Sequence, residues 1–144
     1  MKTTGYSGTP LAKKLGIKGG FKIRLINPPD YYFDLFDDLP DDIEILDDAN
    51  SKKNFIHYFT RQIADFKVDI LLLREEIEQN GMIWVSCPKK SSGVVSDISL
   101  DDVRNFALAN GLVDIKVCAI DEIWSGLKLV IPVKERKSPK TVSE

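Results

Sequence analysis

The chain has little of what marks many families of enzymes and metal-binding proteins. Its 144 residues include two cysteines and a single histidine. Cys87 and Cys118 both lie in apolar segments, which favours buried free thiols in a reducing compartment over a disulfide or a zinc site. No apolar run approaches the roughly 20 residues of a membrane span, and residues 1–10 lack the apolar core of a signal peptide. The sequence therefore predicts a cytoplasmic protein.

The chain also has no large excess of positive or negative charge. The formal net charge is −2, with 43% hydrophobic and 29% charged residues, so no global field attracts nucleic acid. We expect neither a nucleic-acid nor a membrane partner, while a protein partner and the oligomeric state stay open. The length fits a single domain, expected at 9–133, with flexible tails at 1–8 and 134–144.

Six strand-like segments are present, several of them separated by helical ones. A helix is predicted over 63–77, where apolar residues recur at spacings of three and four. The strands are expected at 21–26, 43–46, 54–59, 82–87, 112–120 and 126–133. This alternation predicts a three-layer, Rossmann-like (methyltransferase-like) α/β fold with a mostly parallel sheet. The last strand follows too closely for a crossover, so it is expected to be antiparallel. The predicted strand order is 3-2-1-4-6-5.

A binding site is expected at the carboxyl ends of these strands. In open parallel sheets, ligands bind where the strand order reverses, here between the first and fourth strands. Asn27 follows the first strand, residues 88–93 follow the fourth, and residues 121–125 leave the fifth at the same edge. Three segments with polar or unusual residues therefore meet at one edge.

The loop after the fourth strand has the composition of an anion site. Two lysines, two hydroxyls and a glycine present cations, donors and backbone N–H groups; they are Lys89, Lys90, Ser91, Ser92 and Gly93. The helix expected to start at Ser99 would add its positive end. The alternative is a solvated turn rich in lysine and serine. The P-loop order is absent.

The connection between the last two strands supplies candidates for catalysis. Asp121 and Glu122 are acid–base candidates if a neighbouring tryptophan desolvates them. Trp124 and Ser125 would shape a ligand site together with Asn27, although Trp124 is as compatible with a core position. His57 lies inside an apolar strand and is expected to be a half-buried structural imidazole, which argues against a Ser-His-Asp triad.

No cofactor and no metal site are predicted. A dinucleotide or methyltransferase site needs glycines after the first strand, but this chain has Asn27-Pro28-Pro29 there, and prolines remove N–H donors. Asp47 stands where a ribose-binding acid would, the one matching feature. Residues 34–48 hold eight acidic residues and no base. Since calcium-loop spacing is absent, they favour a solvated acidic face.

Three stretches resemble a bacterial family described only as a domain of unknown function. They are TPLAKKLGIKGG, GMIWVSCPKKSSGVVSDIS and GLVDIKVCAIDEIWSGLKLV. The resemblance implies a compact stand-alone bacterial domain and no particular reaction.

Three functional hypotheses remain open. The first is a protein that binds a small anionic ligand at the predicted edge. The second is an enzyme at the same edge, with Asp121 or Glu122 as acid–base group and Lys89 stabilising charge. The third is a protein-interaction module that uses the acidic and aromatic stretch 31–48, including Tyr31, Tyr32 and Phe36.

Overall fold

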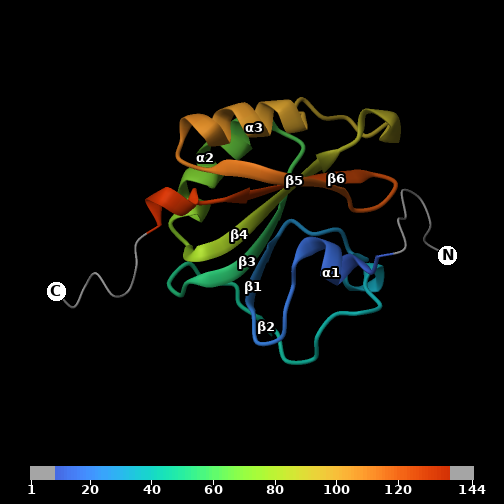
Figure 1. The fold of residues 1–144 in the computed structure, drawn as a ribbon. Coiled ribbons are helices and arrows are strands. Elements are labelled where there is room, and N and C mark those ends of the chain that lie inside the picture. Colours follow the sequence, from blue (N-terminus) through green and yellow to red (C-terminus); the bar gives the residue numbers. More distant parts are fainter. Residues whose placement is uncertain (1–8, 137–144) are drawn as a thin grey trace.

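A six-stranded sheet runs through the middle of the molecule (Figure 1). This computed structural model describes residues 9–136. The parallel pairs are β2–β1, β1–β3 and β3–β4, and β6 pairs antiparallel with both β4 and β5. The strands are β1 (Lys22–Ile26), β2 (Glu44–Ile45), β3 (Lys53–Phe59), β4 (Ile77–Pro88), β5 (Val113–Ala119) and β6 (Trp124–Val130). Five strands therefore run in one direction and β6 against them, which confirms the predicted fold class.

The strand order is 2-1-3-4-6-5, so the predicted position of the third strand was wrong. β3 lies between β1 and β4, while the two-residue β2 forms the edge. The reason is burial: six of the seven β3 residues are buried, whereas both β2 residues are exposed. A strand that is apolar on both faces stabilises the fold only in the interior of a sheet. The placement of the last two strands is confirmed.

The sheet is covered on both faces, as a three-layer fold requires. Helices α2 (Ile63–Arg74) and α3 (Leu100–Ala109) lie together on one face, and the short helix α1 (Leu11–Leu15) lies on the other (Figure 1). The second face is completed by the long connection 27–43, which contains the 3-10 helix η1 (Tyr32–Leu35). The described helical structure in this connection is a single 3-10 turn.

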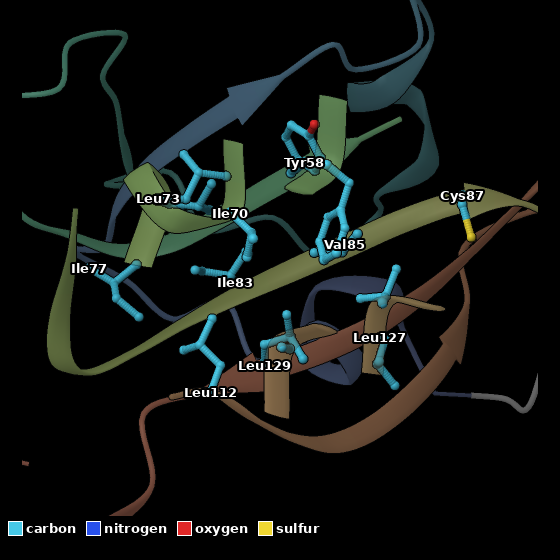
Figure 2. Packing of buried hydrophobic residues seen from close by; sticks show 14 of the residues in the cluster. Tyr58, Ile70, Leu73, Ile77, Ile83, Val85, Cys87, Leu112, Leu127 and Leu129 are labelled. Carbon is cyan, nitrogen blue, oxygen red and sulfur yellow. The ribbon is translucent and has the colours of Figure 1, made fainter. Parts of the chain in front are cut away.

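Two apolar cores result, one on each side of the sheet. Alternate β4 residues divide between them, with Ile83 and Val85 facing the helices α2 and α3 (Figure 2) and Trp84 facing α1. The Trp84 indole N–H donates to the carbonyl of Leu15 at 2.9 Å, which fixes α1 against the sheet. Period-two alternation along a strand produces this division.

The helix predicted over 63–77 is shorter than its apolar pattern indicated. It ends at Arg74, and Ile77 already pairs with Lys53 as the first residue of β4. Gly81 lies within β4, where a Cβ would be 3.0 Å from the Lys53 carbonyl. Asn80-Gly81 is therefore a close-packed irregularity within the strand.

Polar side chains cap the first turns of α3 and α1. The helix expected to start at Ser99 does so, and Ser99 and Asp102 form a capping box at the start of α3. The Asp38 carboxylate accepts the N–H groups of Ala12 and Lys13, both at 3.0 Å. The acidic stretch 34–48 thus includes a helix cap and is not only a solvated face.

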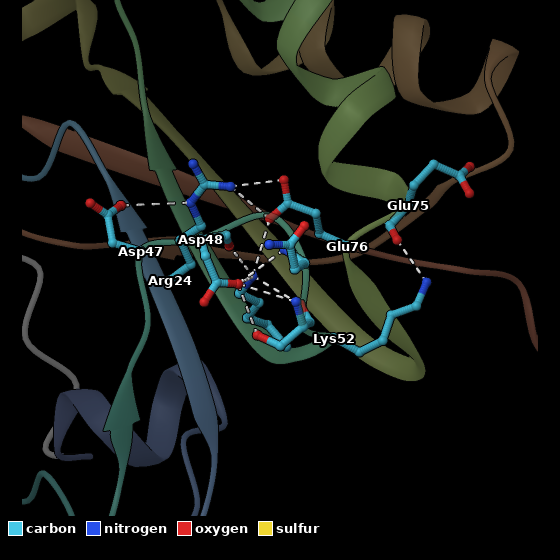
Figure 3. A network of polar contacts seen from close by, with 9 residues as sticks. Arg24, Asp47, Asp48, Lys52, Glu75 and Glu76 are labelled. Carbon is cyan, nitrogen blue, oxygen red and sulfur yellow. Dashed lines mark hydrogen bonds and ion pairs between the residues drawn. The ribbon is translucent and has the colours of Figure 1, made fainter.

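The amino end of the sheet is held by a polar network (Figure 3). Arg24 donates to both carboxylate oxygens of Glu76, at 2.7 and 2.8 Å. The fully buried Lys53 ammonium donates to the carbonyls of Asp48 and Ser51 and lies 3.5 Å from Glu76. Each buried charge has partners, as burial demands.

None of the helices in residues 9–136 has the length and apolar character needed to cross a bilayer. Val133–Glu135 form a 3-10 turn at the predicted domain boundary. Of the predicted tails, residues 1–8 and the part of 134–144 beyond residue 136 lie outside the described residues.

Candidate functional site

The carboxyl ends of the strands meet as expected, but the strand order moves the point of reversal. Because β3 lies beside β1, the order reverses between these two strands. The Asn27 side-chain amide donates to the carbonyl of Phe59 at 3.3 Å, which ties the β1 exit to the β3 exit. The Lys89 N–H donates to the carbonyl of Ile123 at 2.7 Å, which ties the β4 exit to the β5–β6 turn.

A pocket of about 660 Å³ opens beside the β4 exit, on the side of the sheet that carries α2 and α3. Its lining comes from the end of β4, the connection to α3, the first turn of α3 and one residue of β6. These residues are Cys87, Pro88, Lys89, Lys90, Val94, Ser96, Asp97, Ile98, Ser99, Leu100, Asp102 and Ser125. Of the predicted site residues, the structure brings Lys89, Lys90 and Ser125 together here.

The rest of the predicted anion loop lies beside this pocket. Lys90–Ser92 form the 3-10 helix η2, and Gly93 closes it with φ 79°, a left-handed conformation that glycine adopts without strain. The Ser92 hydroxyl accepts the N–H of Val94 at 3.1 Å. Ser91, Ser92 and Gly93 therefore shape the loop, while Lys89 and Lys90 line the pocket.

The pocket holds charges of both signs. The lysine ammonium groups of Lys89 and Lys90 have no ion pair with residues 9–136. The two aspartates are engaged at helix starts: Asp97 accepts the N–H of Ile63 at 2.7 Å, and Asp102 accepts that of Ser99 at 3.0 Å. The aspartates are thus held by backbone N–H donors, whereas the lysine ammonium groups have no ion-pair partner within residues 9–136.

Cys87 forms part of the pocket floor as a neutral thiol. It is 2% exposed, and burial together with the Asp102 charge raises its pKa to about 11. The thiol therefore stays protonated near neutral pH, and the thiolate is the nucleophilic form of cysteine.

The β5–β6 turn lies next to the β4 exit, but its residues Asp121 and Trp124 do not line the pocket. One Asp121 oxygen accepts the N–H groups of Ile123 and Trp124, both at 2.8 Å, and the other accepts the Tyr31 hydroxyl at 2.7 Å. Burial, followed by the bond to Asp121, raises the pKa of Tyr31 to about 12. Asp121 thus holds the turn and the connection after β1 in place, whereas Glu122 lies exposed on the same turn.

Trp124 is half-buried and packs toward the core beside α1. Its ring meets Phe59 edge to face, with centroids 5.0 Å apart. The structure therefore separates the predicted residues: Asn27, Asp121 and Trp124 do not line the pocket that Lys89, Lys90 and Ser125 share.

A buried hydrogen-bonded chain was missed by sequence reasoning. His57 is fully buried, and its two ring nitrogens contact the Tyr32 hydroxyl at 2.9 Å and the Ser86 hydroxyl at 2.8 Å. The imidazole stacks on Phe59 with centroids 4.2 Å apart. Burial lowers the pKa of His57 to about 3, so the ring is neutral. His57 is more deeply buried than the expected half-buried imidazole.

The chain has a methyltransferase-like fold. It resembles a type 11 methyltransferase from Sulfolobus solfataricus with a TM-score of 0.61, 13% identity and coverage of 90% of this chain and 94% of that one. For the ribosomal protein L11 methylase of Lactobacillus delbrueckii the TM-score is 0.56, the identity 9%, and the coverage 84% of this chain and 75% of that one. For DhpI, solved as a complex with SAH, the TM-score is 0.59, the identity 10%, and the coverage 86% of this chain and 83% of that one.

These likenesses concern the fold alone, because identity is low. Two further methyltransferases are longer, and the chain spans 53% and 34% of their lengths. No protein-family model matches the chain, and no curated protein matches it significantly.

The residues at the point of reversal do not suit S-adenosylmethionine in the manner this fold implies. Such a site needs glycine backbone close to the ligand after the first strand. Here Asn27 takes the left-handed conformation with φ 56°, and the following Pro28 and Pro29 offer no N–H donor. The Asp47 side chain is 95% exposed and lies 4.0 Å from the Arg24 guanidinium.

No group of three or more potential metal ligands converges within residues 9–136.

Proposed function

We propose that this chain binds a small anionic ligand in the pocket between the β4 exit and the start of α3. The observation that carries the proposal is the pair Lys89 and Lys90, two ammonium groups without an ion-pair partner in residues 9–136, at a pocket of about 660 Å³. That volume lies within the range of small-molecule sites. Lysine suits phosphate and carboxylate groups as a compact charge.

The rest of the lining limits how the ligand would lie. Its charged group would meet the lysines, because Asp97 and Asp102 at the other side repel an anion. The Ser125 hydroxyl offers one further polar contact from β6. Cys87, Pro88 and Ile98 supply an apolar floor, so a ligand with a charged end and an apolar body fits this division.

Methyl transfer is a second candidate, supported by the fold that the chain shares with methyltransferases. The proline pair after β1 weighs against it, because it takes the place of a glycine-rich turn. Acid–base catalysis by Asp121 has less support still, since both of its carboxylate oxygens already accept hydrogen bonds. Glu122 stays an untested candidate.

An interaction module built on residues 31–48 is the third candidate. Tyr31 and Phe33 are 37% and 51% exposed, whereas Tyr32 is buried and Phe36 packs against the core. The apolar surface there is therefore smaller than the sequence suggests.

A thermal-shift screen tests these candidates together. The panel holds sugar phosphates, nucleotides, dicarboxylates and S-adenosylmethionine, each run on the natural chain, on Lys89→Ala and on Lys22→Ala. Lys22 is an exposed β1 lysine remote from the pocket, so it controls for a general loss of positive charge. A ligand at about 100 times its Kd adds roughly 2.7 kcal/mol, which raises the Tm by several degrees.

We expect an anion to raise the Tm of the natural chain and of Lys22→Ala but not of Lys89→Ala. A shift with S-adenosylmethionine that survives Lys89→Ala would favour methyl transfer instead. If no compound shifts the Tm, both small-molecule functions lose their support.

A further inference from the structure

Four lysines gather on the face of the sheet that carries α1, away from the pocket. Lys14 lies in α1 and Lys18 follows it, while Lys116 and Lys128 are paired residues of β5 and β6. The Lys116 ammonium donates to the carbonyl of Lys14 at 2.8 Å. A Cβ on Gly16 would lie 3.6 Å from the Lys128 ammonium. We call Lys14, Lys18, Lys116 and Lys128 the lysine cluster.

The lysine cluster lacks ion pairs within the described residues, although the Asp42 carboxylate lies beside Gly19, the residue after Lys18. Partial burial, then repulsion by Lys116 and Lys18, lowers the pKa of Lys128. The charges of Lys14 and Lys116 also reach the Cys118 thiol, where they oppose the larger effect of burial on its pKa.

Like charges held this close destabilise the folded chain unless something compensates them. The carbonyl of Lys14 accepts from one ammonium only. The remaining positive charge converges from three separate segments: α1, the residues after it, and the β5–β6 pair. An anion with several charges in a small space would contact all of them at once.

We propose that the lysine cluster binds a compact oligophosphate, a group of two or three linked phosphates. Lysine binds phosphate as a point charge, and several linked phosphates match several ammonium groups at short range. Long nucleic acid is less suited, because the whole chain carries a net charge of −2 and would repel a polymer beyond the cluster. This site is separate from the pocket, which opens on the opposite face of the sheet.

Calorimetric titration with inorganic tripolyphosphate at low ionic strength tests the proposal. We expect one site on the natural chain and a Kd at least about tenfold weaker in the double variant Lys116→Gln, Lys128→Gln, since two charged contacts are lost. Lys22→Gln, which removes an exposed lysine elsewhere, should bind as the natural chain does. Lys89→Ala should also bind normally, which separates this site from the pocket.

The pKa of Lys128 provides a second measurement. Because a bound anion favours the charged ammonium, tripolyphosphate should raise the pKa of Lys128, measured by NMR of the side chain. The double variant should fold at least as well as the natural chain, since it relieves repulsion, and its Tm checks this. Undetectable binding, equal binding by the double variant, or loss of binding in Lys89→Ala instead would overturn the proposal. Tighter binding of a single-stranded oligonucleotide than of tripolyphosphate would also overturn it.

Discussion

Polar groups on the two sides of the β4 exit differ in whether they have partners within the described chain. On the side of α1, the Ser86 hydroxyl, the His57 ring and the Tyr32 hydroxyl satisfy one another inside the core. On the side of α2 and α3, Lys89 and Lys90 face a pocket without an ion-pair partner in the described chain. The polar residues at the end of β4 and just after it thus differ in role: Ser86 is bonded within the core, and the two lysines are available to a ligand.

This comparison distinguishes polar groups that stabilise the fold from polar groups that can bind a ligand. A buried hydroxyl or imidazole is costly unless it has a partner, so a closed set of partners indicates a role in stability. An exposed ammonium without a partner contributes little to stability and can act on another molecule. The predictions below test this distinction.

The largest expected effect is a pH dependence that originates in His57. Its pKa falls from 6.5 in the unfolded chain to about 3 in the fold, so only the unfolded chain takes up this proton between these values. Stability should therefore be full above pH 6.5 and decrease as the pH falls toward 3, by up to about 5 kcal/mol at 1.36 kcal/mol per pKa unit. Urea denaturation across this range measures it.

The variant His57→Gln provides the matched comparison. It keeps hydrogen-bonding capacity but loses the titrating ring, so its stability should depend less steeply on pH in this range. Equal slopes in both chains would mean that other groups cause the acid sensitivity.

Much of the fold could be predicted from the sequence, and the error has a physical source. Alternating and continuous apolar runs identify strands, but the strand order depends on which strand needs burial on both faces. The apolar residues Phe55, Ile56 and Phe59 indicate that β3 needs burial on both faces, while β2 is too short to occupy the interior of the sheet. The pattern that extended α2 to Ile77 failed because an apolar residue at helical spacing can equally begin a buried strand.

The sequence identified the loops that form the candidate site, but it did not predict which side chains in them contact one another. The residues after β4 and the start of α3 are close in sequence, so Lys89, Lys90 and Ser99 could be brought together by inspection. Ser125 and Trp124 are neighbours in the chain, yet a strand directs them to opposite faces. His57 finds its partners 25 and 29 residues away, a distance at which a single sequence carries no signal.

The next largest effect tests how tightly the α1 side is built. A methyl group on Gly126 would lie 3.0 Å from the Ser86 hydroxyl and 3.1 Å from the Trp84 ring. Both side chains are fully buried and hydrogen-bonded, so neither can move freely. Gly126→Ala should cost about 2 kcal/mol of unfolding free energy, measured by urea denaturation.

Ser125→Ala is the control on the pocket side of the same strand. It should change stability by less than about 0.5 kcal/mol. A similar loss in both variants would remove the contrast between the two sides.

A smaller effect is expected when one end of the buried chain is removed. Tyr32→Phe keeps the ring that packs on His57 and Phe59 but leaves one imidazole nitrogen without its partner. The cost should be about 1–2 kcal/mol, the price of an unsatisfied buried polar group. Tyr31→Phe, which removes an exposed hydroxyl bonded to Asp121, should cost less in the same thermal or urea unfolding assay.

The smallest expected effect lies on the pocket side. Lys90 is exposed and has no ion pair in residues 9–136, so Lys90→Gln should change the unfolding free energy by less than about 0.5 kcal/mol. The same variant should weaken binding of any anion that Lys89→Ala weakens, because both ammonium groups border one pocket. A loss of stability above about 1 kcal/mol would show that this side, too, depends on satisfied charges. Unchanged anion binding would leave Lys89 alone as the recognition group and reduce the pocket to a single-charge site.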